Sequence, residues 1–121
     1  RRVLSELADG YLIYMLNQVV ETGSGRRAQI DGWQMGGKTG TSQVRRILER
    51  GVDQATLPWA QRHHALFVAF APAINPQWVA SVVVEHGGSG SAAAAPIAHK
   101  IMRYLQPNPA AELSEEQANG A

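Results

Sequence analysis

The chain has 121 residues, of which 45% are apolar and 17% are charged, so it can form one globular domain or part of a larger one. Its formal net charge of +1 is far from the basic footprint of a nucleic-acid-binding protein. Cysteine is absent, which excludes disulfides and thiolate metal sites. The first residue is an arginine, and we expect the chain to be a piece of a longer protein.

A helix is predicted over residues 3–22. Its apolar residues recur at spacings of three and four, which is typical of a helix with one packed face. The stripe comprises Leu4, Leu7, Ala8, Tyr11, Leu12, Met15, Leu16 and Val19. We expect this stripe to pack in the core rather than to lie on a membrane. Glycine tolerates the left-handed conformation after a helix, so the turn at 22–25 predicts the helix end.

A short hairpin is predicted next, with one strand at 26–30 and a second at 33–43. Asp31-Gly32 between them is a tight-turn signal. Glycines inside a strand often mark a place where another backbone or a ligand approaches closely. The second strand holds three of them around its lysine: Gly36, Gly37 and Gly40.

Residues 44–62 form a long polar connection, in which 44–50 could make one or two helical turns. Two apolar strands are predicted after it, at 65–71 and 78–85. Pro72 ends the first of them, and the five residues 73–77 that follow it are short enough for a hairpin, so this pair should be antiparallel.

A closing helix is predicted after the glycine-rich segment at 87–90, with Ser91 as a possible N-cap. Pro96 would then lie beyond the first turn, so the helix either begins near Ala94 or bends at Pro96. Its apolar stripe comprises Ile97, Ile101, Met102 and Leu105. Residues 106–121 have the composition of a disordered tail.

The element order predicts an α+β fold, in which about three antiparallel strands carry the N- and C-terminal helices on one face. Strands this apolar should have both faces covered, and two helices cover only one. We therefore expect part of the fold to be missing. Residues 1–105 would be the C-terminal part of a larger domain, followed by the tail at 106–121.

The segment Gly37–Gln43 is the most informative one, because it places a lysine among glycines and hydroxyl residues. Residues 32–39 match the phosphate-loop pattern G-x-x-x-x-G-K-T. That loop must follow a buried strand and open a helix, and the polar residues before Gly32 disfavour it. An exposed strand edge suits the segment better, because Thr39 and Thr41 would then share one face and could bind a carboxylate.

The segments Arg26-Arg27-Ala28 and Gly37-Lys-Thr-Gly-Thr-Ser-Gln43 resemble the third-motif region of penicillin-binding transpeptidases. Two later segments, Ala65-Leu-Phe-Val-Ala-Phe-Ala-Pro72 and Val82-Val-Val-Glu-His-Gly-Gly-Ser-Gly90, are similar to the strands that follow that motif. The resemblance spans roughly residues 26–105. It is greatest to the monofunctional class B type, and within it to the elongation-type group known as penicillin-binding protein 2.

The resemblance implies a β-lactamase/transpeptidase-like domain that acts on peptidoglycan stem peptides and β-lactams, without a cofactor. It implies catalytic roles for Lys38 and Thr41 and substrate binding by Lys38, Thr39, Gly40 and Thr41. Thr39 and Thr41 would bind the terminal carboxylate, and the backbone N–H of Thr41 would be one of two oxyanion donors. The implied partners are the rest of the transpeptidase domain and cell-elongation machinery proteins. The implied location is the periplasmic side of the inner membrane, with the anchor outside this chain.

The chain departs from the family pattern in its serines. None of them begins the S-x-x-K element of the nucleophile or the S-x-N element. We therefore predict that the chain is inactive by itself. A non-catalytic peptide-binding or scaffold module remains an alternative, and a phosphate-loop nucleotide binder is a less favoured one.

Several other polar residues have simpler explanations than a site. His63-His64 has no partner at ligand spacing, so a metal site is not expected. Glu85-His86 is interpreted as a solvent-facing pair at a strand end. Ser42 and Gln43 are possible rim residues, and Trp59 is the tryptophan best suited to touch substrate or partner.

Overall fold

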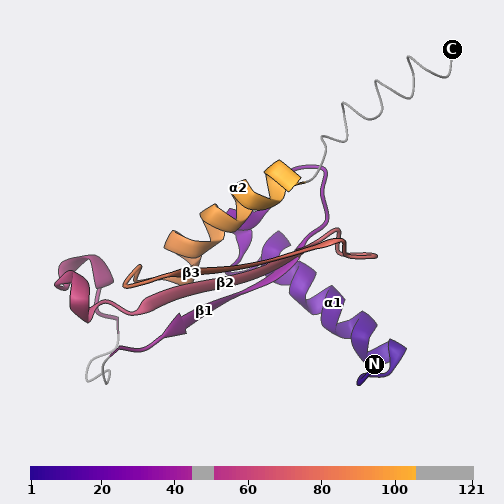
Figure 1. Ribbon diagram of the computed structural model, residues 1–121, viewed down its shortest axis with the longest axis horizontal. Coiled ribbons are helices and arrows are strands. Elements are labelled where there is room, and N and C mark those ends of the chain that lie inside the picture. The colour runs from indigo at the N-terminus through magenta and orange to yellow at the C-terminus, as the bar shows by residue number, and fades with distance from the viewer. Residues whose placement is uncertain (45–50, 106–121) are drawn as a thin grey trace, which may run out of the picture.

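A computed structural model describes residues 1–44 and 51–105 of the chain. Within them, β1 (Gly36–Ser42), β2 (His64–Ala71) and β3 (Trp78–Val84) form one antiparallel sheet in the order β1-β2-β3. The helix α1 (Glu6–Glu21) precedes the sheet and α2 (Ala95–Leu105) follows it (Figure 1). The predicted α+β fold and the antiparallel pairing of the two apolar strands are confirmed.

The core lies on one face of the sheet, which we call the helix face. Directly opposed residues of antiparallel strands share a face, and alternate residues of β2 are fully buried there. These are Ala65, Phe67, Ala69 and Ala71. The same buried cluster contains Val20 of α1 and Met102 of α2. Both helices therefore pack on one face, as predicted.

The opposite face of the sheet, which we call the open face, is apolar but not covered by the described residues. Val79 is 73% exposed and Val83 is 59% exposed. The register places Leu66, Val68 and Phe70 on the same side. In addition, β3 pairs only with β2 in the described sheet, so its other edge has no strand beside it there. Both observations agree with the expectation that the chain carries part of a larger fold.

The predicted first helix is confirmed over Glu6–Glu21, but the prediction that its apolar stripe packs in the core is wrong for the described chain. Ser5 caps the helix, because its side chain accepts a hydrogen bond from the Ala8 N–H. Leu7 and Tyr11 are exposed, and Asn17 and Val20 are the buried residues. Only the C-terminal half of α1 reaches the sheet, where the Asn17 amide donates to the Met35 carbonyl at 2.8 Å. Neither described helix is long and apolar enough to cross a membrane.

The predicted strand at 26–30 is wrong, because this segment forms a short 3-10 turn, η1 (Arg26–Ala28). The chain therefore has no hairpin with β1 at this point. Ala28 is fully buried against the helix face. The carbonyl of Gln29 lies 2.8 Å from Nδ1 of His99 on α2, so a side chain takes the place of a strand partner.

The connections differ from the prediction in detail. The segment between β1 and β2 contains two 3-10 turns, η2 (Gln54–Thr56) and η3 (Trp59–Gln61). The N-cap before the closing helix is Ser89 rather than Ser91, and it opens a wide π-type turn, η4 (Gly90–Ala94). Since α2 begins at Ala95, Pro96 falls in its first turn, where proline is tolerated. The suggested helical turns over 45–50 and the predicted tail at 106–121 lie outside the described residues.

Candidate functional site

The predicted site residues all lie on β1, the edge strand of the described sheet. Thr39 is opposite Phe67 and Thr41 is opposite Ala65, whereas Lys38 is opposite Val68. The two threonines therefore belong to the helix face and Lys38 to the open face. This arrangement excludes a phosphate loop, because Lys38 lies inside a strand instead of at the start of a helix.

Two aromatic rings of β2 explain the glycines before Lys38. A Cβ on Gly36 would overlap the ring of Phe70 on the open face. A Cβ on Gly37 would lie 2.8 Å from Cζ of Phe67 and 2.7 Å from the Val68 carbonyl oxygen. The strand is thus held between one ring on each face, which fixes its path just before Lys38. The predicted close approach is correct at both glycines.

Gly40 also lies close to another backbone, but its neighbour is not a ring of β2. A Cβ on Gly40 itself would make only an ordinary 3.4 Å contact with Leu66. The close approach comes instead from Gly90 of η4, where a Cβ would lie 2.6 Å from the carbonyl oxygens of both Gly40 and Leu66. The start of η4 is therefore packed against the middle of the Lys-Thr-Gly segment.

The Lys38 ammonium lies along the strand edge and reaches Thr39. Its Nζ donates to the Thr39 carbonyl oxygen at 3.1 Å and to Thr39 Oγ1 at 3.4 Å. The Lys38 side chain is exposed, while Thr39 is half-buried. A cation and a hydroxyl are thereby brought together on an accessible edge, a combination that suits an anionic group such as a carboxylate.

Ser24 contacts the candidate site, and the sequence reasoning missed it. It lies in the turn after α1, and its Oγ is 3.1 Å from Oγ1 of Thr39. Lys38 can only donate a hydrogen bond, so it takes one lone pair of the Thr39 oxygen. When Ser24 donates to the second lone pair, the Thr39 proton is left for an outside acceptor. The only signal in the sequence is a hydroxyl residue between the two glycines of the turn.

Thr41, Ser42 and Gln43 are all exposed at the far end of β1. Ser42 is opposite His64, and the N–H of Val44 donates to Nδ1 of His63 at 3.1 Å. The strand end that carries Thr41 is thus attached to the start of β2 by a histidine side chain. Sequence reasoning treated His63 only as a possible metal ligand.

The prediction that His86 is part of a solvent-facing pair is wrong. Its ring is half-buried, with its centroid 4.2 Å from that of Trp59 and 4.6 Å from that of His64. Trp59 itself remains 59% exposed. Among residues 1–44 and 51–105, no group of three histidine or acidic side chains is placed to hold a metal ion.

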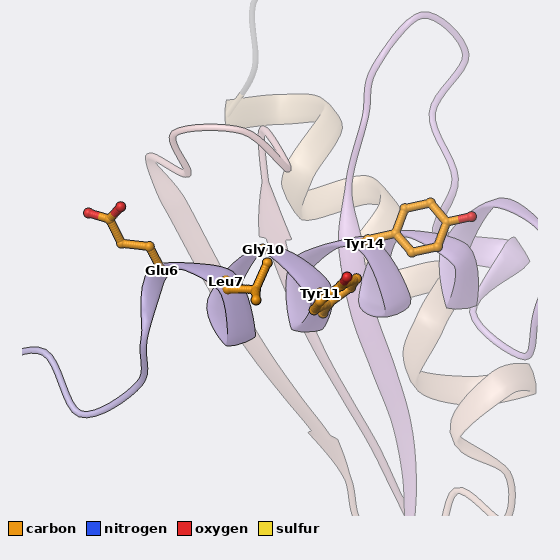
Figure 2. A pocket seen from close by; sticks show the side chains of 5 residues that line it. All are labelled: Glu6, Leu7, Gly10, Tyr11 and Tyr14. Atoms are coloured by element: carbon orange, nitrogen blue, oxygen red, sulfur yellow. The ribbon is translucent and has the colours of Figure 1, made fainter.

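An open apolar hollow lies along α1 and involves none of the β1 residues. Figure 2 shows Leu7 and Tyr11 projecting from one side of the helix, with Tyr14 one turn further along. Glu6 and Gly10 complete the lining. Because these side chains are exposed, the hollow is a surface feature of the uncovered half of α1 and not part of the Lys38 site.

The Lys38 strand lies within a segment that matches a known protein family. The profile of the penicillin binding protein transpeptidase domain matches residues 2–103. The peptidoglycan D,D-transpeptidase MrdA of Haemophilus influenzae is 42% identical over 84 residues, which is 68% of this chain and 13% of that relative.

Two solved structures have the same fold as the described chain. Pseudomonas aeruginosa PBP2 in complex with WCK 5153 is 35% identical with a TM-score of 0.67, and the match covers 89% of this chain and 22% of that one. The ceftriaxone acyl-enzyme of penicillin-binding protein A from M. tuberculosis is 30% identical with a TM-score of 0.63, covering 85% and 22%. The chain thus spans less than a quarter of each of these proteins.

Proposed function

The chain belongs to the penicillin-binding protein transpeptidase domain family, and from this premise we propose that it supplies the substrate-binding edge of a peptidoglycan D,D-transpeptidase. The parent enzyme cross-links stem peptides through a serine acyl-enzyme and is acylated by β-lactams on the periplasmic side of the inner membrane. The observation that carries this proposal is the position of the Lys38 ammonium, 3.1 Å from the Thr39 carbonyl and 3.4 Å from its hydroxyl on an edge strand.

The first role of this edge is to bind the substrate carboxylate. Thr39 and Thr41 lie on one face of β1, so their hydroxyls can donate to the same anion. Hydrogen bonds to an ionised group are roughly twice as strong as neutral ones. The carboxylate at the end of a D-Ala-D-Ala stem peptide, or that of a β-lactam, is the ligand we assign to them.

The second role is to polarise the carbonyl that is attacked. The backbone N–H of Thr41 is one of two oxyanion donors, and the loss of one such donor typically costs about 10²–10³ in rate. Lys38 adds positive potential close to the reacting serine. Gly40 separates the two threonines, so that both project from the same face of the strand.

The nucleophile comes from outside the 121 residues. None of the seven serines begins an S-x-x-K or S-x-N element. Without nucleophile and base, the chain forms no acyl-enzyme by itself. One observation favours a second function for the chain alone: β1 has no strand at its outer edge in the described sheet, so an extended peptide can add there without reaction.

The test is a chimera of Pseudomonas aeruginosa PBP2 in which residues 2–103 of this chain replace the matching segment. A fluorescent penicillin should label the chimera covalently. Lys38→Ala removes one charge-assisted contact worth about 1.5–3 kcal/mol, so the labelling rate should fall about 10–150-fold.

Lys100→Ala is the matched control, because Lys100 is the other lysine of the chain and lies exposed on α2. Its labelling rate should equal that of the parent chimera. The isolated chain should take no label. A stable label on the isolated chain, or an unchanged rate in the Lys38 variant, contradicts the proposal.

A further inference from the structure

His63 and His64, two consecutive histidines at the start of β2, each accept a backbone hydrogen bond at Nδ1. The two donors belong to different segments. Nδ1 of His63 accepts the N–H of Val44 at 3.1 Å, just after β1. Nδ1 of His64 accepts the N–H of His86 at 2.9 Å, just after β3. His63 is only 6% exposed while Val44 is 40% exposed, so their contact is part-buried.

These two contacts fix the protonation state of the rings. A backbone N–H can only donate, so Nδ1 of each ring must be free of a proton, and a neutral ring carries its proton on Nε2. A second proton would turn Nδ1 into a donor that faces another donor. The contact between His63 and Val44 therefore exists only while the imidazole is neutral.

The backbone of His63 is held independently of its ring. Its N–H donates to Oε1 of Gln54 at 2.9 Å, and its carbonyl accepts the N–H of Gly88 at 2.9 Å. Three separate segments thus meet at one residue. Protonation breaks only the contact to Val44, because the other two use backbone atoms that do not titrate.

We propose that His63 is a positioning residue, whose neutral imidazole holds the Val44 N–H and so fixes the end of β1 that carries Thr41, and whose protonation releases that end. The release of Val44 on protonation of His63 follows from the hydrogen bonds described above. Its consequence for substrate rests on the proposed function, since only there does Thr41 bind a carboxylate and donate to an oxyanion.

Other titratable groups lie near His63, and their hydrogen bonds must be considered when the pH is lowered. The rings of His64 and His86 lie beside each other, with centroids 4.6 Å apart. His86 Nδ1 donates to the Arg62 carbonyl at 2.8 Å, and that bond survives protonation. The titratable or charged residues of the adjoining described segments are Asp53, Arg62, His64, Glu85 and His86. Histidine is the side chain among these that gains a proton in mildly acid solution.

The experiment is an NMR titration of the full chain with labelled imidazole nitrogens. At neutral pH, His63 should be in its Nε2–H form and the Val44 amide should be protected from exchange. Acidification should lower the protection factor of Val44 about five- to tenfold, the change that corresponds to one lost hydrogen bond. The amide of Phe67, in the central strand, should keep its protection.

Two variants of His63 test whether Val44 needs a hydrogen-bond acceptor at this position, with or without a ring that can be protonated. His63→Asn places a side-chain oxygen near the Nδ1 position and does not titrate, so Val44 should stay protected at all pH values. His63→Leu should leave Val44 unprotected throughout. His99 is the internal control, because its Nδ1 faces the carbonyl of Gln29 at 2.8 Å and keeps that bond when protonated.

Three results would overturn the proposal: an Nδ1–H form of His63 at neutral pH, protection of Val44 that does not follow protonation of His63, or parallel loss of protection at Phe67. If the leucine variant does not fold, the titrations of the natural chain and the asparagine variant decide. Because no activity is measured, failure of penicillin labelling in the chimera leaves this result unaffected, and the reverse also holds.

Discussion

Both faces of β2 are apolar from residue 65 to residue 71, but they differ in what covers them. On the helix face, Phe67 is fully buried in the cluster that also contains Val20 of α1 and Met102 of α2. On the open face, the next residue, Val68, is 46% exposed. A run of apolar residues therefore predicts a strand that is buried on both faces in the complete fold. The two helices of this chain cover only one of those faces.

The open face and the exposed stripe of α1 are two apolar surfaces of the described chain. On the sheet, Val79 and Val83 are more than half exposed. Leu7, Tyr11 and Tyr14, which line the hollow of α1 (Figure 2), are also more than half exposed. Exposed apolar surface of this kind marks a place where another part of a protein packs. It agrees with a chain that spans less than a quarter of its relatives.

The largest expected effect comes from removing a side chain on the buried face. Phe67→Ala should lower the free energy of unfolding by about 3–5 kcal/mol, because the site is fully enclosed. Phe70→Ala on the open face should cost only about 1–2 kcal/mol, because that ring is half-buried. Urea denaturation of both variants measures the difference. Equal losses would mean that the two faces are covered alike.

A glycine exchange gives the next largest contrast. Gly90→Ala should destabilise the chain by about 1–3 kcal/mol, because the new methyl group would lie 2.6 Å from the carbonyl oxygens of Gly40 and Leu66. Gly10→Ala should instead stabilise it by about 0.5–1 kcal/mol, because nothing lies within 4 Å and alanine favours the helix. Thermal unfolding of both variants checks the opposite signs. A stabilised Gly90 variant would show that η4 does not press on β1.

The apolar strands and the Lys38 edge could be predicted from sequence because their signals are local. The six residues between β2 and β3 require a hairpin, and the alternation of Thr39 with Thr41 fixes their common face. The segment at 26–30 was predicted wrongly, and one reason is that the partner of its Gln29 carbonyl is a histidine 70 residues away. His99 faces the carbonyl of Gln29, and no periodicity in the segment itself reports that contact.

The Lys38 part of the candidate site was predictable because its signal is local, whereas its contacts from other segments were not. Lys38 stands out among glycines and threonines in the sequence itself. Ser24 and His63 act on β1 from other segments, through contacts of 3.1 Å to Thr39 and to Val44. Residues of this kind are found only after the fold brings the segments together.

Substitution on the open face should have a small effect on stability and a larger one on association. Val68→Thr with Val79→Thr should change the free energy of unfolding by less than about 0.5 kcal/mol per residue, since both side chains are substantially exposed. Sedimentation should show less self-association than in the natural chain, because the apolar patch is interrupted. The helix-face exchange Ala69→Thr is the control and should destabilise the chain. A large loss of stability in the open-face variant would mean that this face is already buried.

The smallest effect on stability is expected where the two faces meet, at the Thr39 hydroxyl. Ser24→Ala removes an exposed contact of 3.1 Å, so the free energy of unfolding should change by less than about 0.5 kcal/mol. In the chimera, however, Thr39 loses the partner that directs its proton outward, and penicillin acylation should slow about two- to tenfold, the value of one neutral hydrogen bond. Ser24→Thr keeps the hydroxyl and should acylate normally. If the alanine and threonine variants react alike, Ser24 only closes the turn after α1 and has no part in orienting Thr39.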